Sequence, residues 1–156
     1  MMGGAPCKQN GLGMIEVLVA LVIMAVGLLG LAAMQVTATQ TTTQSAQKTQ
    51  AILLAEDMIE RVRANQSNAG SYDGVSVGSD DSCSLNYTPS GSNVASNDVN
   101  GWGNSVRCLL ADGSGQVEVD TSARTVEVTL SWESRKDSGD ADAIAGEDTV
   151  TLATSY

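Results

Sequence analysis

An acidic side chain, Glu16, lies at the front edge of a long apolar segment, where a charge is costly to keep. Residues 17–34 are 18 consecutive apolar or glycine residues. As an α-helix rising about 1.5 Å per residue, this run would span about 27 Å, close to the hydrocarbon thickness of a bilayer. Because a carboxylate at that border is expensive to bury alone, we predict that Glu16 has a partner or a specific function.

Two cysteines follow the apolar segment, and their chemistry depends on the compartment. Cys83 and Cys108 are an even pair in a region that we expect to be exported, whereas Cys7 precedes the segment. This arrangement predicts a Cys83–Cys108 disulfide. Closing a loop of about 25 residues would contribute roughly 3.5 kcal/mol. Two free thiols or a metal pair are the alternatives, and the lack of histidine argues against a metal.

Other catalytic or ligand-binding patterns are missing from the sequence. It has no histidine, no Gly-x-Ser-x-Gly, no phosphate-binding loop and no Cys-x-x-Cys. Acidic residues gather near the C-terminus, but their spacing does not match a calcium-binding loop, so we interpret the segment as a solvated loop. They are Asp137, Asp140, Asp142, Glu147 and Asp148. Asp80 and Asp81 are interpreted in the same way. We therefore expect no enzymatic activity, no metal and no cofactor.

Composition limits both the partners and the core. The net charge of −10, without a basic cluster, argues against nucleic-acid binding and is typical of a soluble exported surface. The chain has no phenylalanine, two tryptophans and three tyrosines. The part outside the apolar segment is short, so its core must be small and would benefit from a disulfide.

One long helix is predicted to continue beyond the apolar segment. Residues 36–50 are rich in Thr and Gln but contain no Pro or Gly. Beyond them an apolar stripe recurs at helical spacing, formed by Ile52, Ala55, Ile59 and Val62. Arg61 and Arg63 suit a helix C-terminus, and Asn65 begins a stop pattern. We predict a single helix from about Met14 to Asn65.

The remaining residues predict a small antiparallel sheet. Residues 66–104 resemble a loop with one short strand at 84–87, and further strands are predicted at 105–110, 116–120, 125–133 and 149–153. Residues 112–115 resemble a turn between two of these strands. The apolar side of the sheet needs a cover, and the helical stripe is the available partner. The expected fold class is α+β.

Three interpretations compete for the N-terminal segment. It could be a secretory signal cut after the small residues Ala32, Ala33 or Ala38, or an uncut anchor with its N-terminus inside. In the third, the chain is cut before the apolar helix, which stays in the protein. Only the third accounts for both Gly11 and Glu16.

The motifs at both ends of the long helix resemble a known family. The N-terminal segment resembles a type III (prepilin) signal. The resemblance lies in Gly11, the five residues that follow it and the apolar run after Glu16. With this signal, the stretches EVLVALVIMAVGLLGL and AEDMIERVRAN resemble PilV, the type IV pilus modification protein family of minor pilins. The resemblance covers about residues 8–66. The family usually has Phe and Thr after the cut, where this chain has Leu12 and Gly13.

The resemblance implies how the chain is processed and assembled. Residues 1–11 would be a leader cut by the prepilin peptidase after Gly11, with N-methylation of the new N-terminal residue, Leu12. Losing Lys8 would take the side-chain charge from −10 to −11. Residues 12–36 would cross the membrane, 37–66 would be the periplasmic half of the helix, and 67–156 a β-sheet head. Glu16 would pair with the N-terminal amine of an adjacent subunit, since a buried carboxylate needs a counter-charge.

The implied function is structural. The chain would be a minor pilin that initiates or modifies type IV pilus assembly and supports pilus biogenesis, adhesion and twitching motility. It would reside in the bacterial inner membrane, N-terminus in the cytoplasm, before entering the pilus. Expected partners are other minor and major pilins, the prepilin peptidase, the inner-membrane assembly platform and, as a further candidate, a tip adhesin. The alternatives are a minor pseudopilin of type II secretion and a membrane-anchored periplasmic binding domain.

Overall fold

The computed structural model describes residues 13–78, 82–135 and 145–156. The chain divides into two compact units, Met1–Thr42 and Thr43–Tyr156. The elements are α1 (Met14–Ala64), the 3₁₀ helix η1 (Gln66–Tyr72), β1 (Val75–Val77), α2 (Val94–Leu109), β2 (Ser114–Asp120), β3 (Thr125–Arg135) and β4 (Ala145–Ser155). The predicted long helix is confirmed and ends at Ala64, next to the expected stop at Asn65.

The described part of the first unit is helical and solvent-exposed. Its apolar side chains are not packed in a core, and none of the most hydrophobic 18-residue window is buried. The Thr-rich stretch that follows stays helical, although its threonines turn back onto the backbone. Hydroxyls donate to the carbonyl four residues earlier at Thr37, Thr39, Thr41 and Thr42. Such bonds satisfy these hydroxyls within the helix itself.

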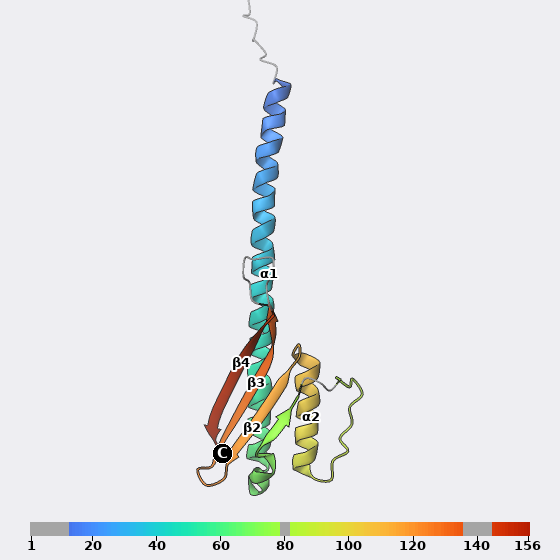
Figure 1. Cartoon of the computed structure of the whole chain (residues 1–156), viewed down its shortest axis with the longest axis vertical. Helices are drawn as coiled ribbons and strands as arrows, with labels where there is room; N and C mark the ends of the chain where they lie inside the picture. The colour runs from blue at the N-terminus through green and yellow to red at the C-terminus, as the bar shows by residue number, and fades with distance from the viewer. Residues whose placement is uncertain (1–12, 79–81, 136–144) are drawn as a thin grey trace, which may run out of the picture. The chain divides into compact units, whose positions relative to one another are not determined.

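The second unit contains a four-stranded antiparallel sheet in the order β1-β2-β3-β4. Figure 1 shows this sheet lying against the later part of α1, with α2 on the side of β1. The strands alternate as the sequence predicts, and β3 buries Val126, Val128, Leu130 and Trp132. α1 contributes a buried stripe of Ala51, Leu54, Ala55, Met58, Ile59 and Val62. The predicted α+β fold, a long helix packed on a small antiparallel sheet, is confirmed.

The prediction of a strand at 105–110 is wrong, because these residues form the end of α2 and the start of the connection after it. The helix begins after Asn93, whose side-chain oxygen accepts a hydrogen bond from the Ser96 amide at 2.8 Å. Ala95, Trp102 and Val106 share its buried face. Its several Asn and Gly residues are poor helix formers, so the packing of this face outweighs local propensity.

Other boundaries also differ from the sequence prediction. Residues 84–87 are not a strand, and the region before them contains η1 and β1, which the polar composition concealed. The expected turn at 112–115 leads from α2 into β2, which already begins at Ser114. β3 and β4 are longer than the predicted strands at 125–133 and 149–153. The two strands pair with each other along their whole length, as far as Arg135 and Ala145.

Trp102 holds three elements of the second unit together. Its ring is fully buried, and its indole N–H donates to the carbonyl oxygen of Leu54 in α1 at 2.9 Å. On the other side the ring reaches β2 so closely that a Cβ on Gly115 would lie 2.5 Å from its nearest carbon. Glycine at this position therefore allows α2 to contact the sheet.

Candidate functional site

The candidate assembly residue Glu16 lies in the first turn of α1 and is exposed. Its backbone amide donates to the carbonyl of Gly13 at 2.9 Å, as expected at a helix start. A negative charge in this turn is favourable, because the unpaired amides of a helix N-terminus carry partial positive charge. Among the described residues, its carboxylate has no hydrogen bond or ion pair. Gly11 and Leu12, the predicted cleavage and methylation residues, lie outside the described residues.

The apolar residues that follow Glu16 form a continuous exposed surface around the helix. From Met14 to Val36 the large hydrophobic side chains are between 48% and 87% exposed. A core helix of a soluble protein would bury one side of such a run, whereas a helix in a bilayer needs no apolar partner. Length, composition and exposure therefore fit a membrane-spanning helix near the N-terminus.

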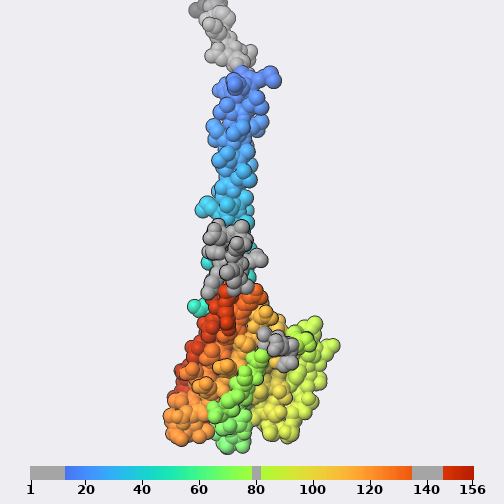
Figure 2. All heavy atoms as spheres, viewed as in Figure 1, coloured from blue at the N-terminus to red at the C-terminus, as the bar shows by residue number. Residues whose placement is uncertain are grey.

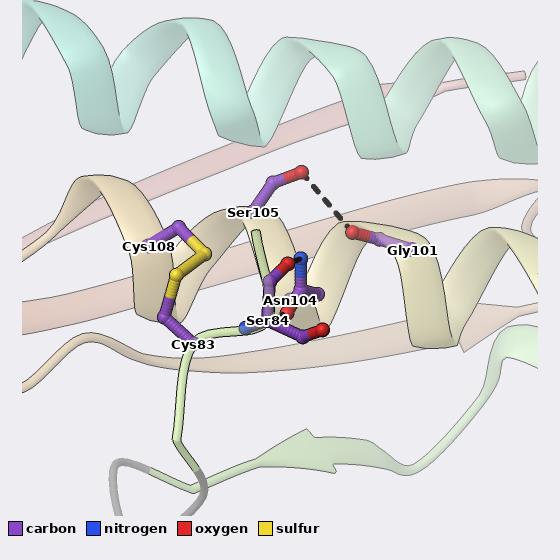
Figure 3. Close-up of a disulfide and its surroundings, with 6 residues drawn as sticks. All are labelled: Cys83, Ser84, Gly101, Asn104, Ser105 and Cys108. Atoms are coloured by element: carbon purple, nitrogen blue, oxygen red, sulfur yellow. Dashed lines mark hydrogen bonds between the residues drawn. A yellow bond between two sulfur atoms is a disulfide. The ribbon is translucent and has the colours of Figure 1, made fainter. Parts of the chain in front are cut away.

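The predicted disulfide is present and connects Cys83 to Cys108 with a Cα–Cα distance of 4.9 Å. Figure 3 shows that Cys108 belongs to α2, so the bond joins a loop to a helix and not to a strand as the sequence predicted. Ser84 and Asn104 add a reciprocal pair of hydrogen bonds beside it. The Ser84 amide donates to Asn104 Oδ1 at 2.8 Å, and Asn104 Nδ2 donates to the Ser84 carbonyl at 3.0 Å.

A polar network connects α1, η1 and α2 on another side of the second unit. Asp98 accepts a 2.6 Å hydrogen bond from the Tyr72 hydroxyl and a 3.2 Å bond from Arg61. Arg61 also pairs with Asp57 at 3.0 Å, and Asn65 Nδ2 donates to the Tyr72 hydroxyl at 3.1 Å. The stretch AEDMIERVRAN, which carries the resemblance to PilV, thus supplies Asp57, Arg61 and Asn65 to a junction between helices.

This network perturbs two ionisable groups. Burial raises the pKa of Tyr72, and its hydrogen bond to the Asp98 carboxylate acts in the same direction. Partial burial alone would lower the pKa of Arg61, but hydrogen bonds and charge attraction from Asp57 and Asp98 outweigh it, so the pKa is raised. Both shifts favour the neutral phenol and the charged guanidinium that the network contains.

Sequence reasoning missed this network because most of it depends on tertiary contacts. The spacing of Asp57 and Arg61 was a signal for a pair along one helix face. Nothing local marked Tyr72 or Asp98, which lie 26 positions apart. No group of three or more potential metal-ligating side chains occurs in the part of the chain that the structure describes. Asp80 and Asp81, like Asp137, Asp140 and Asp142, lie outside those residues, whereas Glu147 and Asp148 belong to β4.

The fold and the N-terminal segment define a class of protein: a pilin-like chain with a long, partly apolar helix and a small antiparallel sheet. Comparisons with known proteins agree with this class. The family model described as type IV pilin Tt1218 matches residues 33–100, and the prokaryotic N-terminal methylation motif matches residues 6–32. Together, the two matches support a type IV pilin of the prepilin type. Neither match is specific for PilV, so that narrower assignment stays a prediction.

The comparisons found no match among the curated proteins or the solved structures.

Proposed function

We propose that this pilin is a minor subunit that initiates or modifies a type IV pilus, and thereby supports pilus biogenesis, adhesion and twitching motility. The main supporting observation is a methylation motif that matches residues 6–32 and so includes most of the exposed apolar run, in a chain whose second unit has its own core. That combination suits a subunit that is stored in a membrane and then taken into a filament. The choice of a minor subunit is supported by the resemblance of residues 55–65 to PilV.

The proposed topology follows from the processing motif. The prepilin peptidase removes residues 1–11 on the cytoplasmic side and methylates Leu12. Residues 12–36 then hold the chain in the inner membrane, residues 37–66 continue the helix in the periplasm, and residues 67–156 form most of the head. In the filament the chain contacts minor and major pilins. The assembly platform inserts it, and a tip adhesin is the further candidate partner.

N-terminal sequencing and intact mass of the protein purified from membranes test this proposal. We expect loss of residues 1–11 and the mass of one added methyl group. A Gly11→Val variant should remain uncut, because it removes the glycine after which the resemblance places the cut, whereas Gly13→Ala should be processed. A mature chain that begins after Ala33 or Ala38 would contradict the retained helix.

The composition of the assembled filament distinguishes the two related machines. In sheared pili we expect the chain at a small fraction of the major subunit, and its deletion should reduce the number of pili. If deletion leaves piliation intact and instead blocks protein secretion, the chain is a pseudopilin and the pilus assignment is wrong.

A further inference from the structure

The two edges of the sheet are protected very differently. β1 has only three residues, and α2 packs against it so closely that a Cβ on Gly103 would lie 3.0 Å from a methyl group of Val77. At the other end, β4 is an 11-residue strand with no neighbour beyond it in the described sheet. In Figures 1 and 2, β4 (dark red) forms one margin of the second unit, away from α2 (yellow to orange).

The strand register shows which backbone groups of β4 point away from β3. The Tyr156 amide donates to the carbonyl of Arg124 at 3.0 Å, so these two residues face each other across the two strands. In an antiparallel pair, facing residues alternate between hydrogen-bonded and non-hydrogen-bonded. Even-numbered residues of β4 therefore bond to β3. The amides and carbonyls of Glu147, Thr149, Thr151 and Ala153 point outward.

Side-chain contacts support this assignment of bonded and outward-pointing residues. In a non-hydrogen-bonded antiparallel pair the side chains come closer together. The hydroxyls of Thr129 and Thr151 are 3.1 Å apart, and those of Ser131 and Thr149 are 3.3 Å apart. One outward carbonyl already has a partner, because Arg63 donates to Ser155 at 3.1 Å. The outward backbone groups from Glu147 to Ala153 have no hydrogen bond among the described residues.

The apolar face beside this edge is also incompletely covered. Val150 and Leu152 are only partly buried, whereas Val128 and Leu130, their neighbours in pairing, are fully buried. A strand added beside β4 would cover Val150 and Leu152, and it would form hydrogen bonds with the outward backbone groups of β4. β4 has no lysine, proline or bulge, the devices by which proteins usually protect an exposed edge. Its inward-facing charge, Asp148, lies near one end.

The charges near the start of β4 indicate which charge an added strand would carry. Glu133 and Glu147 lie directly opposite each other on the outer face, where like charges destabilise a sheet. Neither has an ion pair with a described side chain. A lysine or arginine on an added strand would lie next to Glu147. Glu133, one strand farther at about 10 Å, would also attract it. A second copy of this chain would bring another net charge of −10, so charge favours a different partner.

We propose that β4 is a docking edge for an extended segment of another protein. That segment has apolar residues at alternate positions, which cover Val150 and Leu152, and a basic residue beside Glu147. Its backbone adds a fifth strand to the sheet, pairing with Glu147 to Ala153. The inference goes beyond pilus assembly, because it concerns the second unit alone, whichever filament contains it.

The test uses the full chain in lipid nanodiscs and a fluorescent peptide, Lys-Val-Thr-Val-Thr-Val-Thr-Lys, with a second peptide in which both lysines are glutamates. We expect saturable binding of the lysine peptide, and binding of the glutamate peptide about tenfold weaker at low salt, where charge attraction is least screened. Absence of binding by the lysine peptide, or equal binding of both, would overturn the proposal.

Two variants test the edge directly. Thr151→Pro removes an outward amide without removing a bond to β3, and should weaken peptide binding at least about tenfold. Thr151→Val keeps the amide and should bind as the original chain does. Amide hydrogen exchange keeps the test valid if the proline variant does not fold. The lysine peptide should slow exchange at Thr149, Thr151 and Ala153, and unchanged exchange there would refute docking.

Self-association is the remaining outcome. If the protein in nanodiscs forms a dimer that Thr151→Pro abolishes, the edge belongs to a second copy and the proposed basic partner is wrong. Because none of these measurements uses filaments, a negative result would leave the pilus assignment unaffected.

Discussion

The Asp98 carboxylate accepts hydrogen bonds from side chains of two other elements, Tyr72 in η1 and Arg61 in α1. Losing the Tyr72 hydroxyl would leave one oxygen of this largely buried carboxylate without its 2.6 Å partner. We therefore expect Tyr72→Phe to lower the free energy of unfolding by about 1–3 kcal/mol at neutral pH, measured by urea denaturation. Tyr87→Phe is the matched control. The Tyr87 hydroxyl is buried without a hydrogen bond among the described residues, so its loss should cost little.

The same pair of variants makes a prediction about pH. Burial raises the pKa of Tyr72 above the ordinary 10.0, so the unfolded chain loses this proton first as pH rises. The stabilising contribution of Tyr72 is complete below pH 10 and is lost as pH rises through the folded-state pKa. The difference in unfolding free energy between the original chain and Tyr72→Phe should therefore shrink above pH 10. A difference that stays constant or grows would contradict the network.

Single residues differ in how well the sequence reveals them. The disulfide could be predicted because only two cysteines follow the apolar segment, and the buried residues of β3 because they alternate. Asp98 could not be predicted, because its partners come from distant elements and an aspartate between Asn97 and Val99 resembles any other polar surface residue. The role of Glu16 is predicted from its cost in an apolar setting, and that prediction is not yet tested.

Among the elements, α2 shows how packing outweighs local propensity. Gly115 has no room for a side chain, because a Cβ would lie 2.5 Å from the Trp102 ring. We expect Gly115→Ala to push α2 from the sheet and to lower the unfolding free energy by about 1–3 kcal/mol, as overpacking does. Gly101→Ala, within α2, should instead raise it by about 0.5–1 kcal/mol. There the new methyl would lie 3.6 Å from Tyr87, and alanine is the better helix former.

Thermal or urea denaturation of the two glycine variants measures both effects. Opposite signs would support the observed packing of α2, and equal destabilisation by both would contradict it. The strand that the sequence predicted at 105–110 could not satisfy this pair of expectations, because its apolar residues would then lie in the sheet and not on the helix that carries Gly101 and Trp102.

The disulfide connects the C-terminal end of α2 to the preceding loop, and its main effect should be on the unfolded chain. Replacing Cys83 and Cys108 together by serine should lower the unfolding free energy by about 3.5 kcal/mol on the chain-entropy model. Thiol labelling of the unfolded, unreduced protein checks the bond itself. Two labelled positions at 83 and 108 would refute it.

For the molecule as a whole, the apolar helix and the folded core occupy different parts of the sequence. Buried residues of α1 begin at Ala51, and the first unit contributes none of the described core. The sequence predicts this organisation well, because an uncharged run and an amphipathic run follow one another without Pro or Gly between them. It predicts the arrangement after residue 66 less well, since polar composition conceals the short η1 and β1 and the Asn-rich α2.

This separation allows a sharp test of Glu16, which lies 35 positions before the first buried residue. Glu16→Ala cannot alter the core, and removing a charge should make residence in a bilayer easier. If Glu16 pairs with the N-terminal amine of a neighbouring subunit, its loss leaves that amine buried alone, at a cost of roughly 3–5 kcal/mol. The variant should therefore be cleaved and accumulate in the inner membrane, but be depleted from sheared filaments. Glu56→Ala, an exposed carboxylate on the same helix, should enter filaments normally. Equal incorporation of both variants would show that the Glu16 carboxylate has no part in docking.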